Sequence, residues 1–381
     1  MLCECGKEHK DIIESIRVEE KIIEGVLEDL KEYKTEEILF VTDLPVSKAY
    51  QLFIQELEAV GYSVFRLKRL DDLLPDEQGV GEIILQTTQA TRLIVGIGSG
   101  TLNDLCRYVS YRLNIPYWIV MSAPSMDGYA STASPILVDG FKKTFYCHVA
   151  KRIYGQKDVI NHAPSDMIVA GLGDLLGKIT ALTDWKVSHI LHGEYFCPMI
   201  YRNLYAYIDN LSENLSISQE GLSYKTDTKQ ELGELICESL IQSGIYMHYV
   251  GNSRPASGAE HLISHTLEMK AIEEGKKVDF HGIKVGMATD YVLELYKDLH
   301  QNIDKVKKLY QLDSDQVNDL LMTIEKALEY EKVINDYQKL IPHIRKKYSK
   351  EQIVYAMKQG PVIRDRFTIL SIYKKLGWEN L

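Results

Sequence analysis

The chain has 381 residues, which is too long for one compact domain of ordinary size, so two domains are expected. Its 45% hydrophobic and 26% charged residues are typical of a globular protein and exclude a disordered or fibrous one. The formal net charge of -10, without a long basic block, argues against nucleic-acid binding. No apolar run approaches the length of a membrane span, and the polar N-terminus has no apolar signal core. We expect a cytoplasmic protein.

The six cysteines are mostly scattered, which fits the reducing cytoplasm. Cys3, Cys5 and His9 stand close together at the N-terminus. They either bind a metal ion or belong to a mobile terminal segment. Because no second cysteine pair lies at zinc-finger spacing, the sequence favours the mobile segment.

The first part of the chain alternates predicted strands with predicted helices. Strand-like apolar runs separated by helical segments of ten or more residues indicate parallel pairing through crossover helices. We therefore predict a doubly wound, Rossmann-like α/β domain over residues 1–163. The predicted strands are 37–42, 62–67, 92–96 and 117–121, and the predicted helices are 47–60, 76–89 and 102–113.

A Ser-, Thr- and Gly-rich segment, 131–147, interrupts this alternation and predicts a hairpin with its turn at Asp139 and Gly140. After Pro164 the pattern is helical almost to the end, which predicts an all-α domain over residues 164–381. The expected ligand site is the cleft between the two domains. Examples of the predicted helices are 167–190, 230–242, 259–274, 284–301, 314–331 and 364–376.

A glycine-rich loop follows the strand at 92–96, with glycines at positions 96, 98 and 100. The helix after it begins near Thr101 or Leu102 and would direct free N–H groups and its positive dipole end at an anion. The alternative is a tight turn that needs positive φ angles. Three glycines in five residues exceed what a turn demands, so we favour binding of a dinucleotide pyrophosphate.

Asp43 ends the strand at its sequence FVTD. A carboxylate there can accept hydrogen bonds from the adenosine ribose, and it would repel a 2′-phosphate, which favours NAD over NADP. A helix cap for the following segment is an equally good interpretation.

Three later segments carry candidate metal ligands. Asp174 lies in an apolar helical pattern, where an unpartnered carboxylate would be costly. His261 and His265 are four residues apart and share one face of a predicted helix. His281 opens another helix. One Asp and two His from three helices could hold a divalent ion and leave a position open for substrate. Taken singly, each His is better interpreted as a half-buried, hydrogen-bonded side chain or a helix-terminal residue.

Taken together, the segments GIGSGTLND, SAPSMDGYAS, AGLGD, SGAEHLISH and HGIKVG resemble the metal-dependent polyol dehydrogenase superfamily. This superfamily includes glycerol dehydrogenases, iron-containing alcohol dehydrogenases and dehydroquinate synthases. The resemblance is strongest to glycerol-1-phosphate dehydrogenases, and it extends from about residue 37 to residue 300. It implies a dehydroquinate synthase-like fold.

The resemblance also implies roles for individual residues. Asp174, His261 and His281 would be the metal ligands, with Asp174 also touching substrate, while His265 would lie beside the substrate rather than on the metal. The metal would be Zn or Ni, and Asp with two His does not choose between them. Asp127 would hydrogen-bond substrate hydroxyls, and the remaining residues would bind the dinucleotide: Asp43 at the ribose, Gly98, Ser99, Gly100, Thr101 and Leu102 at the pyrophosphate, and Ser122, Ala123, Pro124, Ser125 and Ser131 at the nicotinamide.

The implied reaction is the reversible reduction of dihydroxyacetone phosphate to sn-glycerol-1-phosphate with NAD(H), or with NADP(H). Arg254 is our candidate for binding the substrate phosphate, with a surface salt bridge as the alternative. His265 or a water would supply the proton. Two other functions stay open, a glycerol dehydrogenase acting on the unphosphorylated polyol and a dehydroquinate synthase-like lyase. A homodimer is expected, and the pathway would be phospholipid biosynthesis.

Overall fold

The computed structural model describes residues 2–68, 73–218, 221–224 and 231–378. Among these, the chain forms two compact units, which we call the sheet unit and the helical unit. The sheet unit consists of Lys10–Ile168 and Gln230–Ile245. The helical unit consists of Met1–His9, Val169–Lys229 and Tyr246–Leu381. The predicted boundary between residues 163 and 164 stays a prediction.

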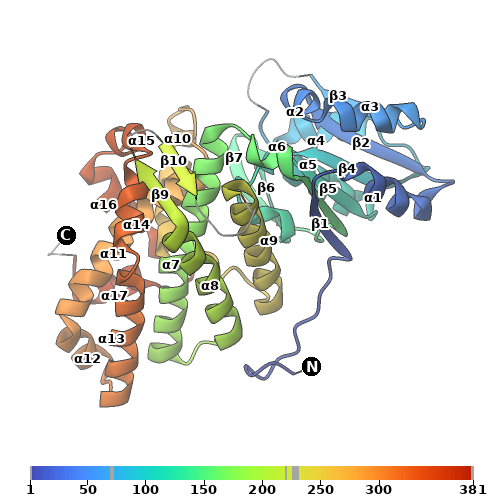
Figure 1. Ribbon diagram of the computed structural model, residues 1–381. Coiled ribbons are helices and arrows are strands. Elements are labelled where there is room, and N and C mark those ends of the chain that lie inside the picture. Colours follow the sequence, from blue (N-terminus) through green and yellow to red (C-terminus); the bar gives the residue numbers. More distant parts are fainter. Residues whose placement is uncertain (1, 69–72, 219–220, 225–230, 379–381) are drawn as a thin grey trace. The chain divides into compact units, whose positions relative to one another are not determined.

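The sheet unit is built on a six-stranded parallel sheet with the strand order β1-β8-β5-β4-β2-β3 (Figure 1). The Rossmann-like α/β fold predicted from the sequence is therefore confirmed. The strands β1 and β8, first and last of this sheet in chain order, were not predicted from the sequence, because both are short and mix charged with apolar residues. The strands are β1 (Ser15–Glu19), β2 (Glu37–Asp43), β3 (Val64–Leu67), β4 (Thr91–Gly98), β5 (Tyr117–Met121) and β8 (Arg152–Gln156).

Helices cover both faces of this sheet, because its central strands are apolar on both sides. One face packs Val41, Ile94 and Ile119 against α4, α5 and the first half of α9. The opposite face packs Phe40, Val95 and Trp118 against α1, α2 and α3. The helices are α1 (Ile23–Asp29), η1 (Leu30–Tyr33), α2 (Leu44–Ala49), α3 (Gln51–Ala59), α4 (Glu77–Ile84), α5 (Gly100–Leu113), η2 (Asp127–Ala130), α6 (Lys157–Asn161) and α9 (Leu232–Val250).

The hairpin predicted in the Ser-, Thr- and Gly-rich segment is present. Its antiparallel strands are β6 (Ala133–Val138) and β7 (Phe141–Tyr146). Both turn residues, Asp139 at φ 51° and Gly140 at φ 77°, adopt the left-handed conformation that a two-residue hairpin turn requires.

The helical unit contains a long central helix, α7 (Ser165–His192), whose residues from Ala170 to Trp185 are all buried. The all-α character predicted from the sequence holds except for one short hairpin, β9 (Leu215–Ser218) with β10 (Gly221–Tyr224). None of the described helices is both long and apolar enough to cross a membrane. The other helices are α8 (Pro198–Asn214), α10 (Ala259–Glu273), α11 (His281–Gln301), α12 (Ile303–Tyr310), α13 (Ser314–Leu328), α14 (Glu331–Gln338), α15 (Pro342–Lys347), α16 (Lys350–Ile363) and α17 (Ile369–Leu376).

Glycines allow α7 and α11 to approach each other closely. A Cβ atom on Gly173 or on Gly282 would collide with backbone of the facing helix, the carbonyl oxygens of Gly282 and Ala170 respectively. A Cβ on Gly177 would come within 2.5 Å of Val285 Cγ1. The glycine spacing in AGLGDLLG and HGIKVG therefore reflects helix packing. The close approach also sets the distance between Asp174, which follows Gly173, and His281, which precedes Gly282.

We expect Gly282→Ala to destabilise the helical unit by about 3 kcal/mol, because overpacking a buried contact costs roughly 1–3 kcal/mol and backbone cannot yield as a side chain can. The measurement is thermal unfolding followed by circular dichroism in the presence of a metal chelator. Gly81→Ala in α4 is the matched control, since no atom lies within 4 Å of its Cβ position. Alanine there should leave the melting temperature unchanged or raise it. Equal melting temperatures for the two variants would contradict the packing argument.

Candidate functional site

The carboxyl edge of the parallel sheet has a topological switch point between β2 and β4. From β2 the chain moves outward to the edge strand β3, and β4 then pairs on the other side of β2. Thr42 pairs with Ile97, and its hydroxyl donates to the Ile97 carbonyl at 2.9 Å. Asp43 and Gly98 therefore end neighbouring strands. Ligands of open α/β sheets bind at such a point.

The glycine-rich loop forms the turn from β4 into α5. Ser99 is the N-cap residue, in extended conformation, and Gly100 is the first residue of the helix. A Cβ on Gly98 would lie 2.6 Å from Leu102 Cβ, so this glycine is required by the turn itself. The Leu102 side chain is buried in the core, and only its backbone can serve a ligand. The first N–H groups of an α-helix have no partner within the helix, which suits an anion.

Asp43 caps α2, because its Oδ1 accepts from the backbone N–H of Val46 at 2.8 Å. The helix-cap interpretation is thus confirmed. Burial raises the pKa of Asp43, while this hydrogen bond lowers it. The cap occupies Oδ1, and a role for the carboxylate at the ribose stays a prediction.

The segment after β5 lies beside the glycine-rich loop. The N–H of Ser122 donates to the Gly98 carbonyl at 3.1 Å. Ser122, Ala123 and Pro124 are buried, whereas Ser125 is half-buried. Farther along, Ser131 is also buried, and its hydroxyl accepts from the N–H of Ala133 at 3.2 Å.

Asp127 opens the short helix η2 in the same segment. Its Oδ2 accepts from the hydroxyl of Ser243 in α9 at 3.3 Å. The residues of the sheet unit that were predicted to contact the nicotinamide and the substrate thus all lie in the segment that follows the carboxyl end of β5.

Arg107 holds this segment in place and was not identified from the sequence. It is fully buried, and its guanidinium donates to the carbonyls of Gly128 (2.5 Å), Tyr129 (3.1 Å) and Ala133 (2.6 Å). Burial raises the pKa of nearby Asp104 to about 7, and Arg107 partly offsets this increase. In the sequence, only the spacing of Asp104 and Arg107, three residues apart on a predicted helix, could have indicated this role.

Three helices of the helical unit bring the predicted metal ligands together. Asp174 comes from α7, His261 from α10 and His281 from the start of α11. One ligand atom of each lies within 4.8 Å of the others. The His261 Nε2 to Asp174 Oδ1 distance is 3.7 Å, and the rings of His261 and His281 are 5.1 Å apart. Convergence on one small volume is what a shared cation requires.

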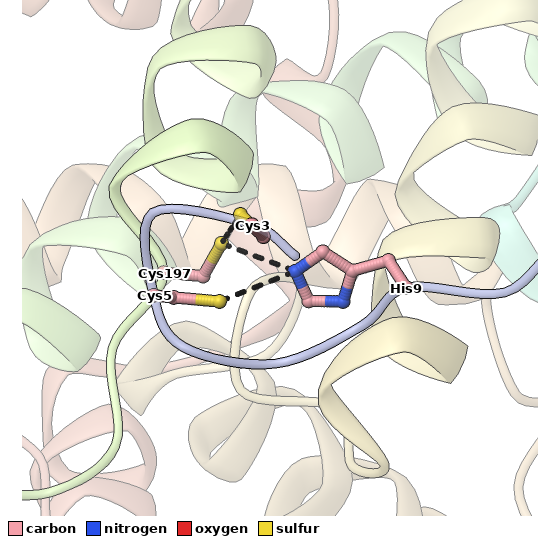
Figure 2. A group of neighbouring side chains, drawn as sticks. All are labelled: Cys3, Cys5, His9 and Cys197. Atoms are coloured by element: carbon pink, nitrogen blue, oxygen red, sulfur yellow. Dashed lines mark hydrogen bonds between the residues drawn. The ribbon is translucent and has the colours of Figure 1, made fainter. Parts of the chain in front are cut away.

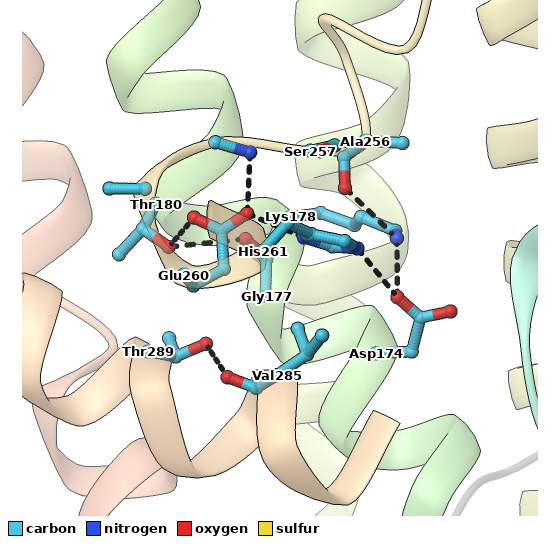
Figure 3. Close-up of polar contacts among 12 residues, drawn as sticks. Asp174, Gly177, Lys178, Thr180, Ala256, Ser257, Glu260, His261, Val285 and Thr289 are labelled. Carbon is cyan, nitrogen blue, oxygen red and sulfur yellow. Dashed lines mark hydrogen bonds and ion pairs between the residues drawn. The ribbon is translucent and has the colours of Figure 1, made fainter. Parts of the chain in front are cut away.

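Glu260 orients the His261 ring. Its Oε1 lies 2.7 Å from His261 Nδ1 and accepts the backbone N–H of Gly258 at 2.6 Å. Its Oε2 accepts from the hydroxyl of Thr180 at 2.7 Å, as Figure 3 shows. Burial raises the pKa of Glu260, and these hydrogen bonds lower it. A carboxylate on Nδ1 favours the tautomer whose Nε2 lone pair faces Asp174, a common arrangement of metal-binding histidines.

The ammonium group of Lys178 lies beside Asp174. No role for Lys178 was predicted from the sequence. Its ammonium group lies 2.7 Å from Asp174 Oδ1 and 3.2 Å from the carbonyl of Ala256 (Figure 3). Both charged side chains have zero exposure. Since a buried carboxylate is costly without an opposite charge, Lys178 compensates Asp174 one helical turn away.

His265 lies next to the three ligands but forms a second group with Glu268 and His281. Its ring stacks on the His281 ring at 5.4 Å and 25°, and its side chain is 30% exposed. Glu268 Oε2 is 3.2 Å from the ammonium of Lys284. Lys284 therefore compensates the charge of Glu268, as Lys178 compensates that of Asp174.

Arg254 forms an ion pair, which was the alternative to phosphate binding; the Arg254 side chain is buried, whereas that of its partner Glu194 is 32% exposed. Arg254 is 3% exposed and binds both carboxylate oxygens of Glu194, with Nε at 2.7 Å from Oε1. Arg366 donates to Ser253 Oγ at 2.8 Å in the same loop. Burial and the neighbouring arginines lower the pKa of Arg366 to about 9.

Comparisons with known proteins give the same picture. Residues 17–164 match a family model described as iron-containing alcohol dehydrogenase. A glycerol-1-phosphate dehydrogenase (NAD(P)+) from Halalkalibacterium halodurans is 34% identical, over 78% of this chain and 74% of that protein. The protein of the same name from Bacillus licheniformis is 27% identical over 98% and 92%. A solved glycerol dehydrogenase from Schizosaccharomyces pombe has a TM-score of 0.61 at 18% identity over 97% and 90%, a likeness of fold alone.

The parallel sheet and the match of residues 17–164 to the family model indicate an oxidoreductase of the iron-containing alcohol dehydrogenase superfamily. Within that superfamily, the chain belongs to the glycerol-1-phosphate dehydrogenase family.

We expect His261→Ala to lower the affinity for the bound divalent ion by about a hundredfold or more, because even removing a partner of a metal ligand costs roughly 10–100-fold. Glu268→Gln and His265→Asn are the controls from the second group, and both should keep the ion. The measurement is metal content after dialysis against a chelator. Loss of the ion in Glu268→Gln with retention in His261→Ala would assign the ion to the second group instead.

Proposed function

We propose that this protein catalyses the reversible, NAD(P)-dependent reduction of dihydroxyacetone phosphate to sn-glycerol-1-phosphate. The observation that carries the proposal is the convergence of Asp174, His261 and His281 within 4.8 Å. The family of the chain supplies the substrate and the dinucleotide, since its relatives are glycerol-1-phosphate dehydrogenases that use NAD(P)+.

The three side chains fit one divalent ion. Asp174 is wholly buried, where positive charge beside its carboxylate is favourable, and the hydrogen bond that His261 Nδ1 donates to Glu260 holds the His261 ring for ligation. One oxygen and two imidazole nitrogens suit Zn or Ni, and three protein ligands leave a position for substrate. We propose one such ion in each chain.

An ion held by Asp174, His261 and His281 would act as a Lewis acid on the ketone oxygen of the substrate. Asp174 touches the substrate as well as the ion. His265 stands beside the three ligands with a partly exposed ring, and it delivers the proton to the C2 oxygen directly or through a water. Asp127 orients the substrate hydroxyls.

A dinucleotide held by the sheet unit would supply the hydride for C2 from its nicotinamide ring. Backbone N–H groups at Ser99, Gly100 and Thr101 bind the pyrophosphate at the start of α5. The Asp43 carboxylate accepts from the adenosine ribose. Ser122, Ser125 and Ser131 line the nicotinamide side, on the segment that Arg107 holds.

Arg254 stays our candidate for the substrate phosphate. Its two bonds to Glu194 support a fixed guanidinium, and a phosphate would compete with that carboxylate for it. Ser253 and Ser257 in the same loop offer further hydroxyl donors.

A homodimer in the cytoplasm completes the proposal. The location rests on composition and on the six cysteines, none of which forms a disulfide. The dimer rests on the resemblance, and light scattering on the purified protein tests it. The formal net charge of -10 supports the further proposal that the protein does not bind nucleic acid.

We expect the purified enzyme to oxidise NADH with dihydroxyacetone phosphate, and to have a kcat/KM at least about tenfold higher for it than for dihydroxyacetone, since a charge-assisted contact to a phosphate contributes roughly 1.5–3 kcal/mol. Chelation should abolish the rate, and Zn²⁺ or Ni²⁺ should restore it. A preference for unphosphorylated dihydroxyacetone would make the protein a glycerol dehydrogenase. No NADH oxidation with either substrate would favour a lyase.

Asp43→Asn should lower kcat/KM for NADH by about tenfold and shift the NADPH-to-NADH ratio toward NADPH, because the amide keeps the cap but loses the charge at the ribose. The measurement is steady-state kinetics with both dinucleotides. Asp76→Asn is the matched control, because Asp76 caps α4 in the same way, accepting from Gly79 at 2.8 Å. If both variants keep the wild-type ratio, Asp43 is a helix cap only.

A further inference from the structure

A second cluster of metal-binding side chains lies at the N-terminus, outside the site described above. One ligand atom from each of Cys3, Cys5, His9 and Cys197 lies within 4.8 Å of the others. Figure 2 shows the four side chains pointing toward one another. All belong to the helical unit.

The N-terminal segment reaches this arrangement through a tight turn. The N–H of Cys3 donates to the Lys7 carbonyl at 2.9 Å, and the N–H of Gly6 donates to the Cys3 carbonyl at 2.8 Å. Gly6 has a φ of 80°, which favours glycine. This turn presents Cys3 and Cys5, and the chain then returns to place His9 beside them. The segment that the sequence favoured as mobile is therefore folded against the helical unit.

Cys197 supplies the fourth ligand from a rigid position. It is fully buried and is the N-cap residue of α8, directly before Pro198. The sequence could not reveal it, because it lies 194 residues after Cys3 and has no cysteine or histidine at a characteristic spacing.

The distances match a shared cation rather than a disulfide. Cys3 Sγ and Cys197 Sγ are 3.7 Å apart, whereas a disulfide needs about 2.05 Å. His9 Nε2 lies 3.3 Å from Cys5 Sγ and 3.5 Å from Cys197 Sγ. Tetrahedral bonds of about 2.3 Å to sulfur and 2.0–2.1 Å to nitrogen imply S–S edges of about 3.8 Å and S–N edges of about 3.5 Å.

We propose that Cys3, Cys5, His9 and Cys197 bind a structural zinc ion, distinct from the ion at Asp174, His261 and His281. Three sulfurs and one imidazole form a closed four-ligand set, and such a set holds a structural ion without a position for substrate. Soft thiolates also separate this site from the oxygen- and nitrogen-based active site, so the two positions select metals differently.

Neighbouring groups support the ligands. The Tyr195 hydroxyl donates to Cys5 Sγ at 3.1 Å, and the His9 ring stacks on Tyr249 at 5.0 Å and 16°. Arg202 forms an ion pair with Glu4 in the turn. A zinc ion with three thiolates carries a net negative charge, and Lys7, whose ammonium lies 3.4 Å from the centre of the Tyr195 ring, brings positive charge to the same turn. Zinc thus fastens the N-terminal segment to the start of α8.

Metal analysis of the full chain tests the proposal. The His261→Ala background removes the active-site ion, so the zinc that remains belongs to the cluster. We expect about one zinc ion per chain in His261→Ala and almost none in His261→Ala with Cys5→Ser. The matched control is Cys147→Ser in the same background, because Cys147 lies outside the cluster, and it should keep the zinc. Equal zinc in the Cys5→Ser and Cys147→Ser proteins would overturn the proposal.

Cobalt substitution gives a readout that needs no variant to fold. Co²⁺ bound to the wild-type protein should show thiolate-to-metal charge-transfer absorption and the intense visible bands of tetrahedral sulfur coordination. Absence of these bands, or a Cys3–Cys197 disulfide in protein purified without oxidant, would also overturn it. Cys5→Ser should lower the melting temperature while kcat/KM stays within about twofold of wild type, which separates this site from the catalytic one. If Cys5→Ser lost most of its activity while its cobalt absorption stayed at the wild-type level, the structural role would be contradicted.

Discussion

The helical unit is organised around one electrostatic constraint, a carboxylate buried in an apolar helix. Asp174 has no exposed surface, and a charge in that position is tolerated only with compensating cations and hydrogen-bond donors. Lys178 supplies one from the next turn of α7, and the imidazoles of His261 and His281 surround the other side. A divalent ion bound here would add positive charge beside the buried Asp174 carboxylate and so stabilise it further.

The surrounding packing serves this carboxylate. The glycines of α7 and α11 allow the two helices to approach closely enough for Asp174 and His281 to share one volume. Asp184 then fixes α10, since its carboxylate accepts the first backbone N–H of that helix, Ala259, at 2.7 Å. Burial and the nearby Glu260 raise the pKa of Asp184 to about 7. Glycine spacing and buried acids thus act together to position His261.

The sequence predicted the elements whose signal is local, and it missed those whose partners are distant. The apolar runs of β2, β4 and β5, the Asp139–Gly140 turn and helices such as α10, α11 and α13 could be predicted because periodicity and turn chemistry act over a few residues. Strands β1 and β8 are short and contain charged residues, so only their pairing in the sheet reveals them. Asp174, His261 and His281 were predicted through resemblance. Lys178, Arg107, Glu260 and Cys197 were not given roles, because their importance comes from contacts that the chain forms only after folding.

The central claim is that one divalent ion is bound by an acid and two histidines from three helices. Anomalous diffraction from crystals of the metal-loaded protein, collected at the absorption edge of the bound metal, tests it most directly. We expect a peak about 2.0–2.2 Å from an oxygen of Asp174 and from one nitrogen each of His261 and His281. A peak among His265, Glu268 and His281, or no peak between α7, α10 and α11, would contradict it.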